Sequence, residues 1–103
     1  MILEMTVSDY TIRAADYCAP EDGAVDSAMR LAASILEAMK TNQKVFVSME
    51  SLPGASSSFF NVIFSELSAK LGPAAVKNRI AFVGLGKTQT MIASRSRAAV
   101  LGS

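Results

Sequence analysis

The chain has 103 residues, of which 50% are hydrophobic and 18% are charged, with a formal net charge of +1, one cysteine and no histidine. We expect one domain over residues 1–103, and the absence of histidine excludes a Ser-His-Asp triad, a Cys-His pair and a His-ligated zinc ion. Because the lone Cys18 also excludes an intrachain disulfide and a cysteine metal cluster, we expect a protein that holds no metal or cofactor and is not an enzyme.

Two short strands and a helix are predicted in the first 40 residues. Apolar residues indicate a strand over residues 2–7, and residues 10–13 are expected to return beside it as a hairpin after a turn at residues 8–9. A Pro-Glu-Asp-Gly turn at residues 20–23 places acidic residues at a helix start. Apolar residues then recur at intervals of three and four over residues 24–40, which predicts an amphipathic helix.

The end of this helix leads into a predicted buried strand. We expect an ion pair between Asp26 and Arg30 within the helix and a left-handed Asn42 that closes it. The nearly continuous apolar run over residues 44–50 then indicates a buried strand, which the Leu-Pro-Gly sequence at residues 52–54 breaks.

The second half of the chain alternates in the same way. Helical spacing predicts a helix that begins near the serines of residues 56–58 and stops at the Gly-Pro pair of residues 72–73. A third core strand is predicted over residues 79–83, and a last helix from about residue 88 to residue 101. This alternation favours the α/β fold class, with a small, mixed but mostly parallel sheet flanked by about three helices.

Charge is divided unevenly along the chain. Residues 1–66 hold four basic and nine acidic residues, a net charge of −5, whereas residues 67–103 hold six basic and no acidic residues, a net charge of +6. The basic third is either a solvated surface or a binding surface for an acidic partner, a phosphorylated ligand or nucleic acid. Its only aromatic residue, Phe82, falls in a predicted strand, so a stacking platform for single-stranded nucleic acid is missing and nucleic acid is not favoured.

The sequence Gly-Leu-Gly-Lys-Thr after the third strand is typical of part of a phosphate-binding loop, in which Gly-Lys-Thr enters a helix. A complete loop also needs a glycine five positions before the second of these glycines, where the chain has Ala81 inside a predicted strand. Two interpretations stay open: a plain glycine turn, or a small anion- or nucleotide-binding site that uses the basic third. The anion-binding candidates are Gly84, Gly86, Lys87 and Thr88.

Three consecutive serines, Ser56 to Ser58, lie between a predicted strand and the start of a helix. Serine is a preferred N-cap because its side-chain oxygen accepts hydrogen bonds from the unpaired amides of the first turn, but one serine suffices for that purpose. A phosphate group in the first turn would be stabilised by the same amides and by the helix dipole. The serines are therefore either a cap or a site of regulatory phosphorylation.

The segment from Val45 to Leu67, VFVSMESLPGASSSFFNVIFSEL, resembles the core of STAS domains, the sulphate-transporter and anti-sigma-factor-antagonist family. It is closer still to the STAS-like domains of unknown function, which show an apolar strand, a turn and Ser-Ser-Phe at the start of a helix. The preceding helix and the following strand fit the same order. The resemblance implies a STAS-like fold and a binding or regulatory role without catalysis.

In anti-sigma factor antagonists the corresponding segment reads Asp-Ser-Ser-Gly, and a kinase with a histidine-kinase-like ATPase fold phosphorylates its first serine. Ser57 takes the place of the phosphorylated serine and Ser58 that of the second serine, while Ser56 replaces the Asp and Phe59 replaces the Gly. The resemblance therefore implies Ser57 as the phosphorylation candidate and such an ATPase as the protein partner. The implied partner-binding residues are Pro53, Gly54, Ser56, Ser58 and Phe59.

The compartment and the oligomeric state are expectations from composition. One cysteine and an N-terminus without a basic cluster favour a reducing cytoplasm over secretion, and the STAS-like resemblance implies a bacterial protein. The longest uncharged stretch, residues 51–65, is too short and too polar to span a bilayer. A homodimer is a third possibility, which exposure of the apolar residues of the last helix would support: Met91, Ile92, Val100 and Leu101.

Overall fold

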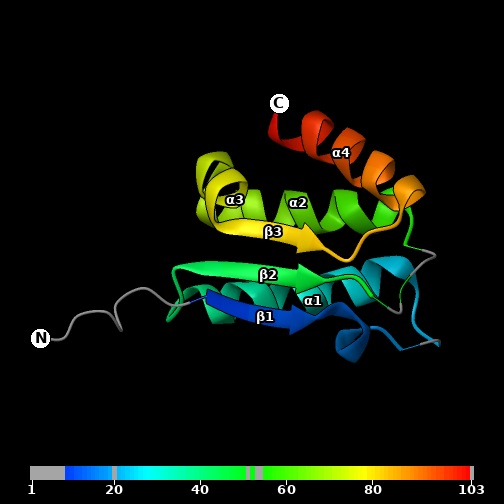
Figure 1. Ribbon diagram of the computed structural model, residues 1–103, viewed down its shortest axis with the longest axis horizontal. Coiled ribbons are helices and arrows are strands. Elements are labelled where there is room, and N and C mark those ends of the chain that lie inside the picture. Colours follow the sequence, from blue (N-terminus) through cyan, green and yellow to red (C-terminus); the bar gives the residue numbers. More distant parts are fainter. Residues whose placement is uncertain (1–8, 20, 51, 53–54, 103) are drawn as a thin grey trace, which may run out of the picture.

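The computed structural model describes residues 9–19, 21–50, 52 and 55–102 and is built on a three-stranded parallel sheet in the order β1-β2-β3 (Figure 1). The strands are β1 (Asp9–Arg13), β2 (Lys44–Ser48) and β3 (Ile80–Val83). The helices are the 3-10 helix η2 (Ala14–Tyr17), α1 (Ala24–Met39), α2 (Ser57–Leu71), α3 (Pro73–Arg79) and α4 (Lys87–Leu101). The predicted α/β fold class is confirmed. The first strand of the predicted hairpin, residues 2–7, lies outside the described residues.

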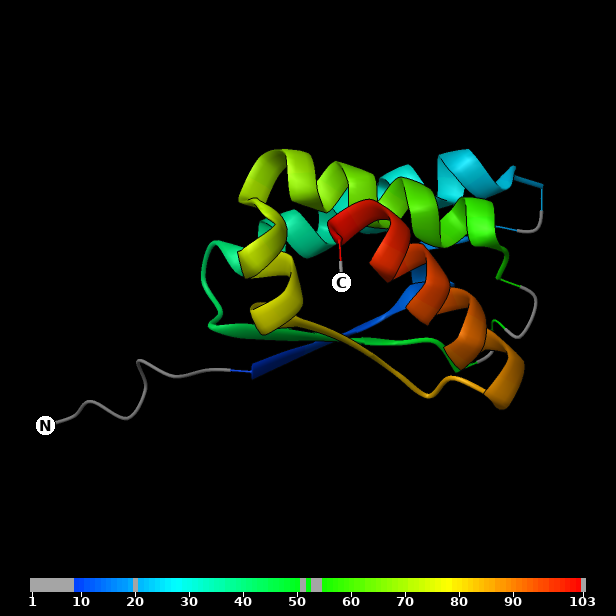
Figure 2. The ribbon, with the colours of Figure 1, turned by 90° about the horizontal axis from the view of Figure 1, so that it is seen from above.

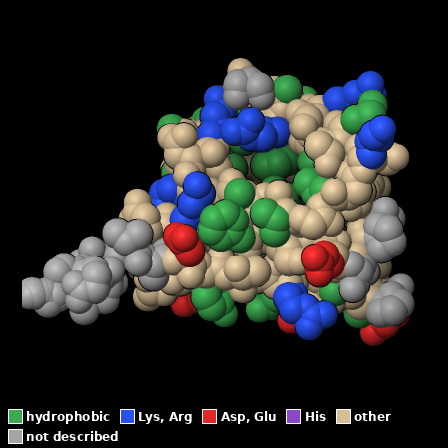
Figure 3. All heavy atoms as spheres, in the orientation of Figure 1, with side chains coloured by type: hydrophobic (Ala, Val, Ile, Leu, Met, Phe, Trp, Pro, Cys, Tyr) green, Lys and Arg blue, Asp and Glu red, His purple; other side chains and the backbone are tan. Residues whose placement is uncertain are grey.

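The helices cover only one face of the sheet. Along β2, Val45 and Val47 are fully buried, whereas Phe46 between them is half-buried. Figure 2 shows α1 and α2 together on one side of the strands, and Figure 3 looks onto the opposite face. The Nζ atom of Lys44 lies 5.7 Å from the centre of the Phe46 ring, which is a cation–π contact. The predicted buried strand is therefore buried on one side only.

The helical spacing read from the sequence places one side of α1 and of α2 in the core. In α1, Leu31 and Ile35 are fully buried at an interval of four, and in α2, Phe60, Ile63 and Leu67 are fully buried at intervals of three and four. These faces pack against each other, and in addition α1 packs against β2 while Phe60 and Phe64 of α2 contact Phe82 of β3. Within the described part of the chain, no helix has the length and hydropathy needed to cross a membrane.

The ion pair at the start of α1 differs from the prediction. Arg30 pairs with Asp22, which lies in the turn before the helix, and not with Asp26. This partner is available because the turn folds back beside the first helical turns, and the guanidinium also donates to the carbonyl of Tyr17 at 3.4 Å. At the other end of the helix, the side-chain Nδ2 of Asn42 donates a hydrogen bond to the carbonyl of Ala38 at 2.9 Å.

The Gly-Pro pair ends one helix and begins another. Gly72 has a φ of 87°, a conformation that favours glycine, and its amide donates to the carbonyl of Ser68 at 2.8 Å, so α2 stops as predicted. Pro73 then occupies the first position of α3, where its fixed φ suits a helix start and its missing amide costs nothing. The described residues therefore form four α-helices where about three were predicted.

Arg79, at the end of α3, binds the loop between α1 and β2. Its Nε donates to the carbonyl of Gln43 at 2.9 Å, and its Nη2 donates to the carbonyls of Asn42 and Met39 at 2.9 and 3.3 Å. One guanidinium thus satisfies three carbonyls near a helix C-terminus, where cations are also favoured by the helix dipole.

Replacing Arg79 by lysine is expected to lower the free energy of unfolding by about 1–3 kcal/mol, because an ammonium group cannot reproduce this planar set of hydrogen bonds. Urea denaturation followed by circular dichroism measures the loss. The matched control is Arg95→Lys, since Arg95 is exposed on α4 and makes no hydrogen bond or ion pair with another described residue. Equal stability of the two variants would contradict the assigned role of Arg79.

Candidate functional site

The two stretches that the sequence singled out lie at the same edge of the sheet. Because β2 and β3 are parallel, the loops after them and the starts of α2 and α4 lie at one end of the molecule, at the right of Figure 1. Two hydrogen bonds join these loops: Met49 N donates to Val83 O at 2.8 Å, and Gln89 Nε2 donates to Leu52 O at 2.6 Å.

Gln89 was not predicted as a site residue. A polar residue on the apolar side of α4 is a signal that could have identified it, because a buried side-chain amide needs a hydrogen-bond partner. Gln89 is only 5% exposed, and its side-chain amide fastens the loop before α2 to the first turn of α4. A buried amide without its partner carries a desolvation penalty, so this hydrogen bond holds the two loops in one arrangement.

The three serines differ in role at the start of α2. Ser56 is the N-cap, and its Oγ accepts a hydrogen bond from the amide of Phe59 at 3.3 Å. Ser57 and Ser58 follow in the first helical turn, are exposed, and form no hydrogen bond with another described residue. Ser56 therefore performs the capping, and the hydroxyls of Ser57 and Ser58 are available to solvent.

The implied partner-binding residues do not all lie on the surface. Phe59 is only 4% exposed and packs edge-to-face on Phe60, with 5.6 Å between the ring centres. It therefore anchors the start of α2 in the core, in contrast to the contact role that the resemblance implied. Pro53 and Gly54 lie outside the described residues. Among the described residues of this set, Ser56 and Ser58 are exposed, with Ser57 between them.

The Gly84 turn is explained by a close approach of two strand ends. Gly84 has a φ of 72°, and a Cβ built on it would lie 2.8 Å from Cγ and 3.3 Å from the backbone nitrogen of Glu50. A side chain would thus be strained and crowded at this position. Ala81 lies within β3, as predicted, so the earlier glycine of a complete phosphate loop is missing.

The start of α4 has some features of an anion site. Gly86 is its N-cap and supplies no side-chain hydrogen bond, and the first turn contains no acidic residue. Lys87 and Thr88 are both exposed there. Amides at a helix N-terminus favour negative charge, so this end of α4 is compatible with weak anion binding as well as with a plain turn.

Cys18 lies near α1 and beside the start of α2. It lines a small hollow of about 190 Å³ together with Ser27 and Ser56. Burial raises the pKa of its thiol, and this outweighs the opposing effects of a hydrogen bond with Ser27 and of the charge of Arg30. A thiol with a raised pKa holds little thiolate at neutral pH, which fits a structural cysteine better than a nucleophile.

The last helix does not present the apolar stripe that would support a homodimer. Met91 is 53% exposed, but Ile92 and Val100 are half-buried against the core and Leu101 is only 6% exposed. A single exposed methionine is ordinary for a monomer surface.

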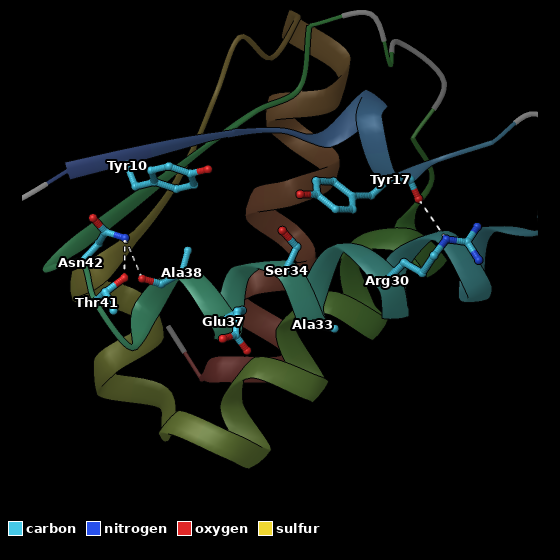
Figure 4. A pocket seen from close by; sticks show the side chains of 9 residues that line it. All are labelled: Tyr10, Tyr17, Arg30, Ala33, Ser34, Glu37, Ala38, Thr41 and Asn42. Carbon is cyan, nitrogen blue, oxygen red and sulfur yellow. Dashed lines mark hydrogen bonds between the residues drawn. The ribbon is translucent and has the colours of Figure 1, made fainter.

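An open groove of about 750 Å³ lies between β1 and α1 (Figure 4). Tyr10 and Tyr17 extend over α1 in this view, and the dashed hydrogen bonds join Arg30 to Tyr17 and Asn42 to its neighbours. The groove contains none of the site residues predicted from the sequence.

Comparison with known proteins supports the fold assignment. A family model described as a STAS-like domain of unknown function (DUF4325) matches residues 27–90, which include β2, α2, β3 and both candidate loops. No match was found among curated proteins or among solved structures.

Proposed function

Because the chain belongs to the family of STAS-like domains of unknown function, we propose that it is a regulatory module that binds a protein partner and does not act as a catalyst. The proposed contact surface is the exposed start of α2 with its adjoining loops, and Ser57 is the proposed switch. The observation that carries this proposal is the division of roles among the serines, in which Ser56 caps the helix and leaves Ser57 exposed.

Phosphorylation of Ser57 suits its position. A partner kinase would transfer the γ-phosphoryl group of ATP to Ser57 Oγ, with loss of the hydroxyl proton and release of ADP. The phosphate would stand at the positive end of the α2 dipole, and the first turn of α2 contains no acidic residue to repel it. The modification would nevertheless add close to two negative charges to the start of α2, which changes how a partner can dock.

The replacement of Asp by Ser56, compared with the anti-sigma factor antagonists, does not remove the helix start. Aspartate and serine are both preferred N-caps, and Ser56 makes the capping hydrogen bond. By the same resemblance, the proposed partner is an ATPase of the histidine-kinase-like type in a bacterial cytoplasm.

The experiment compares binding to such an ATPase after substitution of one serine at a time. Ser57→Asp is expected to weaken partner affinity at least about tenfold relative to Ser57→Ala, because the added charge must be desolvated at the contact surface. Incubation with the kinase and ATP is expected to add one phosphoryl group, located at Ser57 by peptide mass spectrometry.

Ser65→Asp is the matched control, since Ser65 is exposed on α2 but lies two turns beyond the helix start. Equal affinities of Ser57→Asp, Ser57→Ala and the control would rule out the switch. Phosphorylation of Ser58 alone would show that the assignment of the switch to Ser57 is wrong.

A second candidate function is anion or nucleotide binding at residues 84–88. The supporting observation is that the first turn of α4 begins at the exposed Lys87 and has neither a side-chain capping hydrogen bond nor an acidic residue. Calorimetry with inorganic phosphate and with ATP distinguishes the candidates. This second function requires binding that weakens with Lys87→Ala and with added salt, whereas the first requires neither.

A further inference from the structure

A hollow of about 350 Å³ lies between β3 and α4, at the lower end of the size range of small-molecule sites. In Figure 3 a recess on the open side of the molecule has hydrophobic side chains inside it and Lys or Arg side chains on its rim. The recess exists because α4 packs chiefly on α2, and because its residues toward β3 are small: Thr90, Ala93 and Ser94.

The floor of the hollow is apolar and partly accessible. Phe64 from α2 and Phe82 from β3 meet edge-to-face with 5.5 Å between the ring centres. Phe64 is buried, but Phe82 and the neighbouring Leu85 are only half-buried. An apolar group bound in the hollow would therefore bury its own hydrocarbon surface as well as that of Phe82 and Leu85.

The rim carries positive charge only. Lys77 from α3 and Arg97 from α4 line the hollow, and no lining residue is acidic. Within the described part of the chain, neither cation forms an ion pair or a hydrogen bond. Cations beside an apolar, low-dielectric floor attract an anion more strongly than the same charges in open water.

We propose that this hollow is a binding site for a small organic acid, namely a monocarboxylate with an apolar chain. The chain would lie on Phe64 and Phe82, and the carboxylate would stand between Lys77 and Arg97. This site is independent of the proposed function, since Ser57 does not line it, and either assignment can fail without the other.

Four probes that differ in one property each test the chemistry: octanoate, octanol, octylamine and acetate. Binding is followed by amide chemical shifts in ¹⁵N-labelled protein. Octanoate is expected to give saturable shifts in residues 80–83 and 90–97, and to bind at least about tenfold more tightly than each of the others, because only it combines the chain with negative charge. Equal binding of octanol or octylamine, or no saturation by octanoate at several millimolar, would overturn the proposal.

Charge reversal tests the location. The double variant Lys77→Glu/Arg97→Glu is expected to weaken octanoate binding at least about tenfold. The control Arg13→Glu/Arg95→Glu changes the net charge equally but affects exposed residues that do not line the hollow, and it should retain binding. A third variant, Ser94→Trp, places a large side chain at the rim without changing charge and should also abolish binding. If the control lost octanoate binding to the same extent, the effect would be due to the overall charge of the protein, and the proposed site would be refuted.

Discussion

Replacing Phe60 by alanine is expected to lower the free energy of unfolding by about 3–5 kcal/mol, the usual loss for a fully buried aromatic ring. Phe60 is 0% exposed, and its ring centre lies 5.6 Å from those of Phe59 and Phe82 and 6.4 Å from that of Phe64. The substitution removes three ring contacts and leaves a cavity where α2 meets β3. Urea denaturation followed by circular dichroism measures the effect.

Phe46→Ala is the matched control for this prediction. It deletes the same ring, but from the half-buried position on the open face of β2, where solvent fills the space that is left. We expect a loss of about 1–2 kcal/mol, from partial burial and the cation–π contact with Lys44. A loss at Phe46 equal to that at Phe60 would mean that something covers the open face in solution.

Replacing Gly84 by serine is expected to cost about 2–3 kcal/mol of stability. A φ of 72° alone costs a residue with a Cβ about 1–2 kcal/mol, and the approach to Glu50 adds to this cost. The exposed Glu50 side chain can rotate away from a new Cβ, but its backbone nitrogen, 3.3 Å distant, cannot move without disturbing the end of β2. Thermal and urea denaturation should both show the loss.

Gly86→Ser is the control, two residues further on. Gly86 has a φ of −74°, and a Cβ there would meet nothing within 4 Å. As the N-cap of α4, a serine at this position is expected to leave stability unchanged or to raise it by up to about 1 kcal/mol. If both serine variants were equally unstable, the strain assigned to Gly84 would be wrong.

The long elements could be predicted because their signals are local and repeated. Burial of one face gives α1 and α2 their apolar intervals of three and four, and it gives β2 and β3 their apolar runs. All four elements appear close to the expected bounds. The seven residues of α3 are too few to show a period. Their opening proline was therefore interpreted only as the end of the preceding helix.

Several contacts that hold the fold or the candidate site in place join residues distant in sequence. Arg79 reaches carbonyls 36 to 40 residues earlier, and Gln89 reaches one 37 residues earlier. No local pattern reports such pairs. The choice of Ser56 as the cap among three serines is decided by where the first turn begins, which spacing places only to within a residue or two.

The central place of β2 ties both halves of the molecule into one cooperative unit. It pairs with β1 on one side and with β3 on the other, while its buried side chains belong to the same core as those of α1 and α2. If either half detached, one edge of β2 would lose its backbone hydrogen bonds and the buried face of the strand would be exposed to water. Partial opening is therefore expected to cost nearly as much free energy as complete unfolding. Slow exchange of the β2 amide hydrogens thus reports the stability of the entire domain, although solvent touches one face of the strand.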